Sequence, residues 1–527
     1  MSPSTVSRPG RWSAVSRSRP NVLLVLTDQH SHRFLGSRSA DEGGEPVRTP
    51  ALDDLAASSA RFDAAYCPVP LCTPSRFCLL TGKEATRAGG WNNRSVLDPD
   101  LRTLPEHLSG SGYETYLEGK MHLGGTVQFA GFDHRTYGDL TGQSAHQAEP
   151  PDAYDHPPDY GRLLTEVGET AVPESLLQER RVVEETVSSL REHRHAHPDR
   201  PWFMCASFSR PHWPRTAPRR FVDRHEGDVP DPPVGREGDA ADHPLVETCA
   251  DRTGVRDRSR EELRRARAGY FAAVEYIDEI IGDMIARLER EGFLDETVVV
   301  YASDHGDLAG EHGLWEKRTW HEASTRVPLF VGVPAHRSGE AEPATFETPV
   351  SLLDLFPTLC GLVGVDPPGD LDGHDRSAAV REGTEPDPEP VVVDCFGMVG
   401  NPDLHYRMVR DGRYKYVRFR DAPELLFDLE ADPLERRNLA DEEDAPAALT
   451  ELRSFVDDSL SFADADERRE RDERLAERYR LPTPKGDPNQ YHVDGRVIDA
   501  DTLLYHPHVV TDDPAAAYDD YPDDRTG

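Results

Sequence analysis

The chain has 527 residues, which is long enough to bury a large core and to form two domains. Asp and Glu number 97 against 60 Lys and Arg, so the formal net charge at pH 7 is −37. Because nucleic acids and anionic membranes are themselves polyanions, this balance excludes electrostatic attraction to either, and we expect neither as a partner. A strongly acidic, hydrated surface suits a high-salt cytoplasm, so we expect a halophilic source.

Residues 1–19 are rich in Arg and Ser, and we expect them to form a flexible tail. They lack the apolar stretch of a signal peptide, and no apolar run of the sequence is long enough to cross a bilayer. The seven cysteines are scattered without the spacing of a disulfide framework. These features predict a cytoplasmic protein.

Three continuous apolar runs, 21–27, 201–209 and 297–303, predict buried parallel strands. Each run stops at polar residues that can bind metals or anions. In open α/β sheets, ligands collect at the carboxyl ends of the strands, so we expect these residues to share one site. They are Asp28 and Gln29 after the first run, His212 after the second, and Asp304 and His305 after the third.

Between the first two runs, residues 72–82 predict a helix that begins just after Cys72. Pro74 suits a first turn, where its missing N–H would be unpaired anyway. The helix dipole and first-turn N–H groups then favour a nucleophile or an oxyanion at Cys72, and Arg76 can reach back to the same point. The alternative interpretation is a buried structural thiol, the commonest fate of a free cysteine.

A long helix is predicted from a capping box at Ser259 and Glu262 to Gly292, with Glu275 and Asp278 on its solvated face. The segments 140–200 and 214–258 are rich in Pro, Asp and His, and we interpret them as surface insertions.

A linker-like stretch at 381–390 separates the preceding part of the chain from a C-terminal unit. That unit has short strands followed by a charged helical pattern at 445–480. The predicted fold is therefore α/β: a large mixed, mostly parallel sheet flanked by helices, with a smaller C-terminal antiparallel sheet plus helix. We expect four parts, which are the tail at 1–19, a catalytic domain at 20–385, a smaller α+β subdomain at 386–480, and an acidic extension at 481–527.

Lysine is scarce, with five residues against 55 arginines. A lysine kept where arginine is the rule indicates a place for a compact ammonium that can shift its pKa. Two of the five, Lys120 and Lys317, lie in the motifs described next.

The string Cys72-Thr73-Pro74-Ser75-Arg76 resembles the signature of the type I sulfatases, and matching motifs occur in order over residues 20–440. This family belongs to the alkaline phosphatase-like superfamily of metal-dependent hydrolases. The resemblance implies that Cys72 is oxidised to formylglycine by a formylglycine-generating enzyme that binds transiently. The hydrate of that group then attacks a sulfate ester.

The resemblance also implies roles for basic residues of this chain. Lys120 would hold sulfate oxygens, and His122, two residues on, would deprotonate the covalent sulfate intermediate so that sulfate leaves. His212 and Lys317 would contact sulfate near the leaving group, where either could act as an acid. We expect His321 to reach the substrate from the segment after Lys317. For a lone histidine or lysine, the alternative is a surface or core position.

The metal ligands implied are Asp28, Gln29, Asp304, His305 and the modified Cys72. Most arylsulfatases have Asp-Asp and Asp-Asn in place of these two dipeptides, so this sequence looks more like the choline sulfatase and phosphonate monoester hydrolase branch. Family frequency favours Ca²⁺, and a histidine ligand leaves Mn²⁺ or Mg²⁺ as alternatives.

The leading hypothesis is thus a sulfuric ester hydrolase that acts on a small-molecule or oligosaccharide sulfate ester. One alternative is a phosphonate or phosphate mono- or diester hydrolase on the same scaffold. An alternative of another class is a catalytically silent binder of sulfated glycans, against which the charge of −37 argues.

Overall fold

The computed structural model describes residues 19–124, 127–137, 164–227, 229–397, 401–443 and 445–479, together with two short strands, β18 (Gln490–Val493) and β19 (Arg496–Asp499). The predicted tail at 1–19 lies outside these residues except for Arg19. The predicted extension at 481–527 lies outside them except for β18 and β19. In the described part of the chain, no helix is both long and apolar enough to span a membrane.

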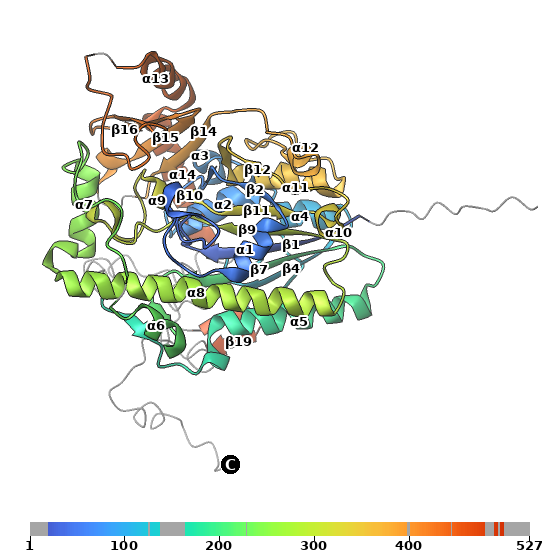
Figure 1. Ribbon diagram of the computed structural model, residues 1–527. Coiled ribbons are helices and arrows are strands. Elements are labelled where there is room, and N and C mark those ends of the chain that lie inside the picture. Colours follow the sequence, from blue (N-terminus) through green and yellow to red (C-terminus); the bar gives the residue numbers. More distant parts are fainter. Residues whose placement is uncertain are drawn as a thin grey trace, which may run out of the picture.

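An eight-stranded sheet forms the centre of the molecule (Figure 1). The three predicted strands lie next to one another in it, with β1 between β9 and β7 and parallel to both. β11 pairs antiparallel with both its neighbours, which makes the sheet mixed as predicted. The strand order is β12 (Thr345–Phe346), β2 (Ala60–Phe62), β11 (Leu329–Gly332), β9 (Thr297–Ser303), β1 (Asn21–Asp28), β7 (Trp202–Pro211), β4 (Glu114–Gly119) and β5 (His134–Tyr137).

Helices cover both faces of this sheet, and the alternation of side chains along β1 shows why the whole strand is apolar. Leu24 and Leu26 pack into one core, whereas Leu23 and Val25 pack into the other. The first core includes α2 (Cys72–Thr81), α3 (Ala85–Ala88), α4 (Leu104–Gly110), α11 (Leu355–Val363) and α12 (Ser377–Glu382). The second includes α1 (Pro50–Ala57), α5 (Gln178–Ala196), α6 (Arg219–His225) and α8 (Arg260–Arg290), of which α5 and α8 run along the same side of the sheet in Figure 1.

The segments predicted as surface insertions are in part core elements. In α5, Val182, Val187 and Leu190 are buried against the sheet. In α7 (Pro244–Thr253), Leu245 and Val246 are buried in a third core. Because both helices have many charged residues on their outer sides, their composition alone suggested loops. Residues 138–163 of the first insertion lie outside the described residues.

A four-stranded antiparallel sheet forms the C-terminal part, as predicted. It contains β14 (Val391–Cys395), β15 (Tyr406–Asp411), β16 (Tyr414–Phe419) and β17 (Leu425–Asp428), followed by α13 (Ala447–Ser459) and α14 (Phe462–Tyr479). Lys415 joins this sheet to α9 (Glu322–Thr325), because its buried ammonium lies 2.7 Å from Glu322 and 2.9 Å from Glu435. Lys415, one of the five lysines, therefore has a structural role.

The remaining elements are short. Two small sheets contain β10 (Arg326–Val327), β3 (Ala65–Tyr66) and β13 (Val350–Ser351), and β6 (Val167–Glu169) with β8 (Arg215–Ala217). A short helix, α10 (Pro334–Ser338), follows β11.

Helix α8 begins with the predicted capping box at Ser259, but the prediction of a solvated face at Glu275 and Asp278 is wrong. Both carboxylates are buried, Asp278 against the start of α1 and Glu275 against the N–H of Arg48 just before that helix. Asp278 accepts hydrogen bonds from the N–H groups of Leu52 (2.8 Å) and Ala51 (3.3 Å). An acidic residue on an amphipathic helix is thus solvated only if no second element covers it.

Asp278 gives the fold a pH dependence. Burial raises the pKa of Asp278 to about 7, against an unfolded value near 3.8. A carboxyl whose folded pKa is raised stabilises the fold fully below about pH 4, and this contribution is lost as the pH rises through about 7. We expect Asp278→Asn, which keeps an acceptor oxygen, to be more stable than wild type at pH 8 by on the order of 2–4 kcal/mol and similar at pH 4.

Urea unfolding at the two pH values measures this difference. Asp283→Asn is the matched control on the same helix, since the Asp283 side chain is 48% exposed and pairs with Arg180 instead of with buried N–H groups. Equal effects of Asp278→Asn at pH 4 and pH 8 would refute the assignment.

Candidate active site

Helix α2 presents Cys72 at its first position. Leu71, the N-cap, is extended, and Gly82 ends the helix in the left-handed conformation with its N–H bonded to the Cys78 carbonyl. Pro74 lies in the first turn as predicted, but the helix begins at Cys72 itself rather than after it. The Thr73 hydroxyl donates to the His122 carbonyl at 2.9 Å, which ties this turn to the Lys120–His122 segment.

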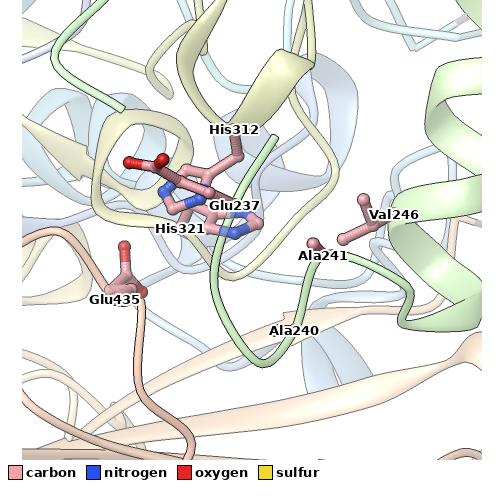
Figure 2. Close-up of a pocket in the computed structure, with 7 residues that line it drawn as sticks. All are labelled: Glu237, Ala240, Ala241, Val246, His312, His321 and Glu435. Carbon is pink, nitrogen blue, oxygen red and sulfur yellow. The ribbon is translucent and has the colours of Figure 1, made fainter. Parts of the chain in front are cut away.

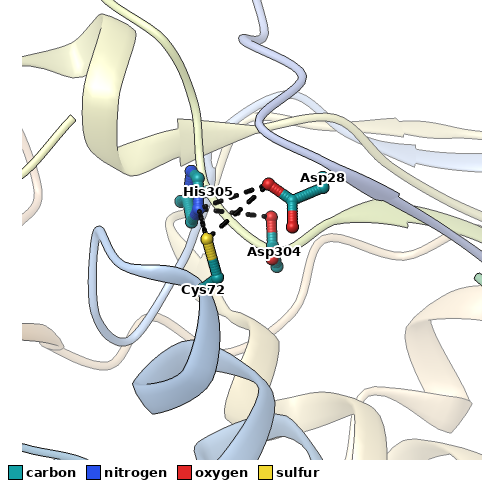
Figure 3. Close-up of side chains that lie close together, drawn as sticks. All are labelled: Asp28, Cys72, Asp304 and His305. Carbon is teal, nitrogen blue, oxygen red and sulfur yellow. Dashed lines mark hydrogen bonds and ion pairs between the residues drawn. The ribbon is translucent and has the colours of Figure 1, made fainter. Parts of the chain in front are cut away.

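The carboxyl ends of β1 and β9 meet beside Cys72, as their parallel pairing requires. Asp28 is the last residue of β1, and Asp304 and His305 follow β9 directly. Figure 3 shows their side chains converging on the sulfur. One ligand atom from each of Asp28, Cys72, Asp304 and His305 lies within 4.8 Å of the others, and all four residues are buried.

Arg76 holds the two aspartates of this cluster. Its guanidinium donates from Nε to Asp304 at 2.7 Å and from Nη2 to Asp28 at 3.1 Å, and it is completely buried. Nη1 donates to the Lys120 carbonyl at 2.6 Å and to the Ser207 hydroxyl at 3.0 Å. The hydrogen bonds of Arg76 thus go to Asp28, Asp304, Lys120 and Ser207, and not to Cys72 as the sequence suggested.

Both predicted lysines reach the cluster. Lys120 Nζ lies 2.7 Å from Asp28 Oδ2. Lys317 Nζ donates to Cys72 Sγ at 3.4 Å and to the side-chain oxygen of Gln29. Burial by itself would raise the pKa of the Cys72 thiol, but the charges of Lys317 and His305 outweigh it and hold that pKa well below its usual value. The pocket therefore stabilises negative charge at position 72.

His305 turns its Nε2 into the cluster. Its Nδ1 lies 3.0 Å from the Gly306 carbonyl, which identifies Nδ1 as the donor and leaves Nε2 as the atom facing Cys72 Sγ at 3.2 Å and Asp304 Oδ1 at 3.6 Å. This orientation, with one ring nitrogen anchored on a carbonyl, is the usual one for a metal-binding histidine.

The two other predicted histidines border the same site. The His122 side chain hydrogen-bonds Cys72 and contributes to the lowered pKa of the thiol. His212 is partly exposed, and its N–H donates to the Asp28 carbonyl at 3.0 Å. Its Nδ1 lies 2.8 Å from the Trp213 carbonyl.

Gln29 is fully buried in the turn after β1. Its φ is 71°, and a positive φ costs free energy in a residue other than glycine. Its amide Nε2 donates to Asp307 and to Glu316, the latter at 3.3 Å. Both carboxylates also bind Arg215. The sequence analysis missed these three residues. The sequence offers two signals for them. Asp307 lies three residues after Asp304, and Glu316 lies next to Lys317.

His321 lies in a different place. It lines a small cavity with His312, whose ring centroid is 3.9 Å from its own, and its Nδ1 contacts the Thr319 hydroxyl at 3.0 Å (Figure 2). The cavity is lined by Glu237, Ala240, Ala241, Val246, His312, His321 and Glu435, none of which belongs to the Cys72 cluster. The structure therefore does not bring His321 together with the other predicted residues.

The cluster suits a divalent cation. Two carboxylates and an imidazole nitrogen are donors that such ions accept, and the buried aspartates repel one another unless a cation lies near. The Gln29 amide oxygen lies against the Lys317 ammonium, which also contacts Cys72 Sγ. Arg76 and Lys120 neutralise part of the aspartate charge from outside the cluster. In the described residues, this is the one group of three or more such side chains that meets the geometry of a metal site.

Comparison with known proteins gives one consistent result for the sequence. A family model described as sulfatase matches residues 20–365, and a model described as the C-terminal part of N-sulphoglucosamine sulphohydrolase matches residues 310–460. The chain is 32% identical over 466 residues to a choline-sulfatase of Rhizobium meliloti, covering 84% of this chain and 86% of that protein. It is 28% identical over 472 residues to an arylsulfatase of Clostridium perfringens, covering 83% and 94%.

Solved structures share the fold. BT4656 in complex with its substrate D-glucosamine-2-N,6-O-disulfate aligns with a TM-score of 0.69 and 22% identity, covering 86% of this chain and 100% of that one. The phosphonate monoester hydrolase of Agrobacterium radiobacter aligns with a TM-score of 0.68 and 23% identity, covering 91% and 99%. The large mixed sheet and the small C-terminal sheet are features of this fold.

Proposed function

Because the chain belongs to the sulfatase family, we propose that it hydrolyses sulfate monoesters with a formylglycine made from Cys72 and a divalent metal beside it. The observation that carries the proposal is the placement of Cys72 at the start of α2, within reach of Lys317, His305 and Asp28. A structural thiol needs no such neighbours. The other six cysteines are also buried, and the pKa of Cys78, on the same helix, is raised by burial instead.

Asp28, Gln29, Asp304 and His305 would hold the metal. When bound, it would polarise the reacting oxygen at position 72 and neutralise charge on the sulfate. His305 in the donor set favours Mn²⁺ over the Ca²⁺ that the resemblance implies, since Ca²⁺ prefers oxygen ligands. Removing metal with EDTA and adding back Ca²⁺, Mn²⁺ or Mg²⁺ one at a time identifies the ion.

The formylglycine would supply an oxygen nucleophile for the sulfur atom once it is hydrated. A formylglycine-generating enzyme would make it during a transient encounter with this chain. The lysines and histidines around Cys72 then have distinct tasks. Lys120 and Lys317 would bind sulfate oxygens from two sides, because both ammonium groups already face the position where an anion is favoured.

Two histidines would move protons. His122, hydrogen-bonded to Cys72, would accept a proton from an oxygen at position 72 and so release sulfate. His212 borders the site with a partly exposed ring, so it would contact the sulfate near the departing alcohol. Arg76 would keep Asp28 and Asp304 in place without touching the substrate.

For the substrate, we propose a small sulfate ester, with choline sulfate the first to test. One observation supports this choice, which is the 32% identity to a choline-sulfatase. Sugar sulfates are a second group, since BT4656 acts on one.

A phosphonate monoester hydrolase is the second candidate, because His305 stands in the donor set and an enzyme of that class shares the fold. Initial rates with choline sulfate, an aryl sulfate, glucosamine-6-sulfate and a phenyl phosphonate monoester separate the candidates. We expect kcat/KM for the best sulfate ester to exceed that for the phosphonate by about 100-fold or more. A higher kcat/KM for the phosphonate would favour the second candidate. Metal-loaded protein that is inactive on all four substrates would favour a silent binder.

A further inference from the structure

The Gln29 side chain faces two opposite kinds of partner. Its oxygen accepts from the ammonium of Lys317, which also donates to Cys72 Sγ at 3.4 Å. Its nitrogen donates to Asp307 Oδ2 and to Glu316 Oε2, at 3.3 Å for the latter. The amide thus separates the reactive centre from a pair of acidic side chains.

These partners fix which way the amide points. A carboxylate can only accept hydrogen bonds and an ammonium can only donate them. If the amide were reversed, its oxygen would face two carboxylates and its NH₂ group would face the Lys317 ammonium. The arrangement therefore admits a single orientation, with the oxygen toward Lys317, whose ammonium also contacts Cys72 Sγ.

Arg215 holds the two acidic side chains in place. Its Nη2 donates to Asp307 Oδ2 at 2.7 Å and to Glu316 Oε1 at 3.0 Å, and Arg215 and Asp307 are completely buried. The guanidinium lies 5.0 Å from the ring centroid of Trp315, which packs against it. The other oxygen of Asp307 accepts from the Ala309 N–H at 2.7 Å.

The backbone of Gln29 is fixed by a separate contact. The Tyr270 hydroxyl of α8 donates to the Gln29 carbonyl at 2.6 Å and accepts from the Ser31 N–H at 3.0 Å. Main chain and side chain are therefore both immobilised, although the backbone has a positive φ. Such a held conformation indicates that the direction of the amide matters to the site.

We propose that Arg215, Asp307 and Glu316 are positioning residues that lock the Gln29 amide with its oxygen toward Lys317 and the bound metal. This inference rests on the proposed function for the identity of the metal site. It assigns a task to residues that touch neither the substrate nor the metal. Without the lock, the amide would be free to present its NH₂ group, which cannot bind a cation.

The test compares Arg215→Met with a matched control, Arg407→Met, in the full chain. Arg407 is a buried arginine that likewise bridges two carboxylates, Asp394 at 2.8 Å and Glu84 at 2.6 Å, but it lies in the C-terminal sheet. Calorimetry measures the Kd for Mn²⁺ alone, which needs neither formylglycine nor turnover. Outer contacts of metal ligands typically change affinity by about 10-fold to 100-fold, so we expect a rise of that size for Arg215→Met and none for Arg407→Met.

A neutral network keeps the test valid if Arg215→Met does not fold. In Arg215→Met combined with Asp307→Asn and Glu316→Gln, the like charges are gone, so folding should recover. The substituted amides can both donate and accept, however, so Lys317 alone still selects the Gln29 orientation. We expect this triple variant to be more stable than Arg215→Met, with its Kd for Mn²⁺ still raised about 10-fold or more. Arg215→Lys keeps one positive charge between the carboxylates. Its Kd for Mn²⁺ should therefore lie between those of wild type and Arg215→Met.

A triple variant with the wild-type Kd would overturn the positioning role. Wild type that binds Mn²⁺ but releases no sulfate would refute the proposed function and leave the lock supported if Arg215→Met still weakens binding. Wild type that binds no divalent cation at all would overturn both.

Discussion

Replacing Cys72 by alanine is expected to lower kcat/KM for a sulfate ester by about 10,000-fold or more, because the variant cannot form the aldehyde that supplies the nucleophile. The fold should survive, since alanine suits the first position of a helix and α2 is held by its apolar side. Sulfate release measured against circular dichroism spectra separates lost chemistry from lost structure.

Cys78→Ala is the matched control. Cys78 lies on the same helix and is equally buried, but burial raises its pKa and its neighbours are core residues. We expect Cys78→Ala to lose stability by about 1–2 kcal/mol and to keep its activity. Activity that survived Cys72→Ala would refute the assignment of the nucleophile.

Lys317→Ala is expected to lower kcat/KM by about 100-fold to 1,000-fold, since it removes the charge that faces both Cys72 Sγ and the Gln29 oxygen. Lys317→Arg should not restore activity, because a planar guanidinium cannot replace a compact ammonium between these two atoms. Steady-state kinetics with an aryl sulfate measure both effects.

Lys83→Ala serves as the control, because Lys83 is buried too but pairs with Asp370 at 2.5 Å. Full activity of either Lys317 variant would contradict the role that we infer from the rarity of lysine. Lys415 shows the limit of that argument, since it is also retained but binds Glu322 and Glu435, neither of which belongs to the Cys72 cluster.

The sequence was sufficient for the parts of the site that follow from strand geometry. Polar residues that end parallel strands must meet at one edge of the sheet, so Asp28, Asp304 and the helix at Cys72 could be placed together. The apolar runs also predicted the central strands, because strands buried on both faces lack alternation.

Contacts made by turns could not be predicted in the same way. Glu316 and Arg318 both have positive φ, so the chain changes direction on either side of Lys317. Lys317 therefore points to Cys72, whereas His321, four residues later, lines another cavity. Arg215 comes to Asp307 from β8, a contact across 92 residues for which no local pattern exists.

Burial of polar residues was the other source of error. The sequence predicts a solvated face at Glu275 and Asp278, because the helix pattern shows only one apolar side. The pattern cannot show that Asp278 accepts from free N–H groups at the start of α1, or that Glu275 accepts from the N–H of Arg48 just before it. Likewise, α5 has few apolar residues, but its three valines and its leucine are all buried.

Mass spectrometry of the tryptic peptide that spans residues 62–76, from protein purified from its native host, tests the central claim most directly. The account predicts a peptide in which position 72 has exchanged sulfur and two hydrogens for one oxygen, while Cys67 in the same peptide keeps its thiol. An active enzyme whose peptide carried an intact thiol at both positions would contradict it.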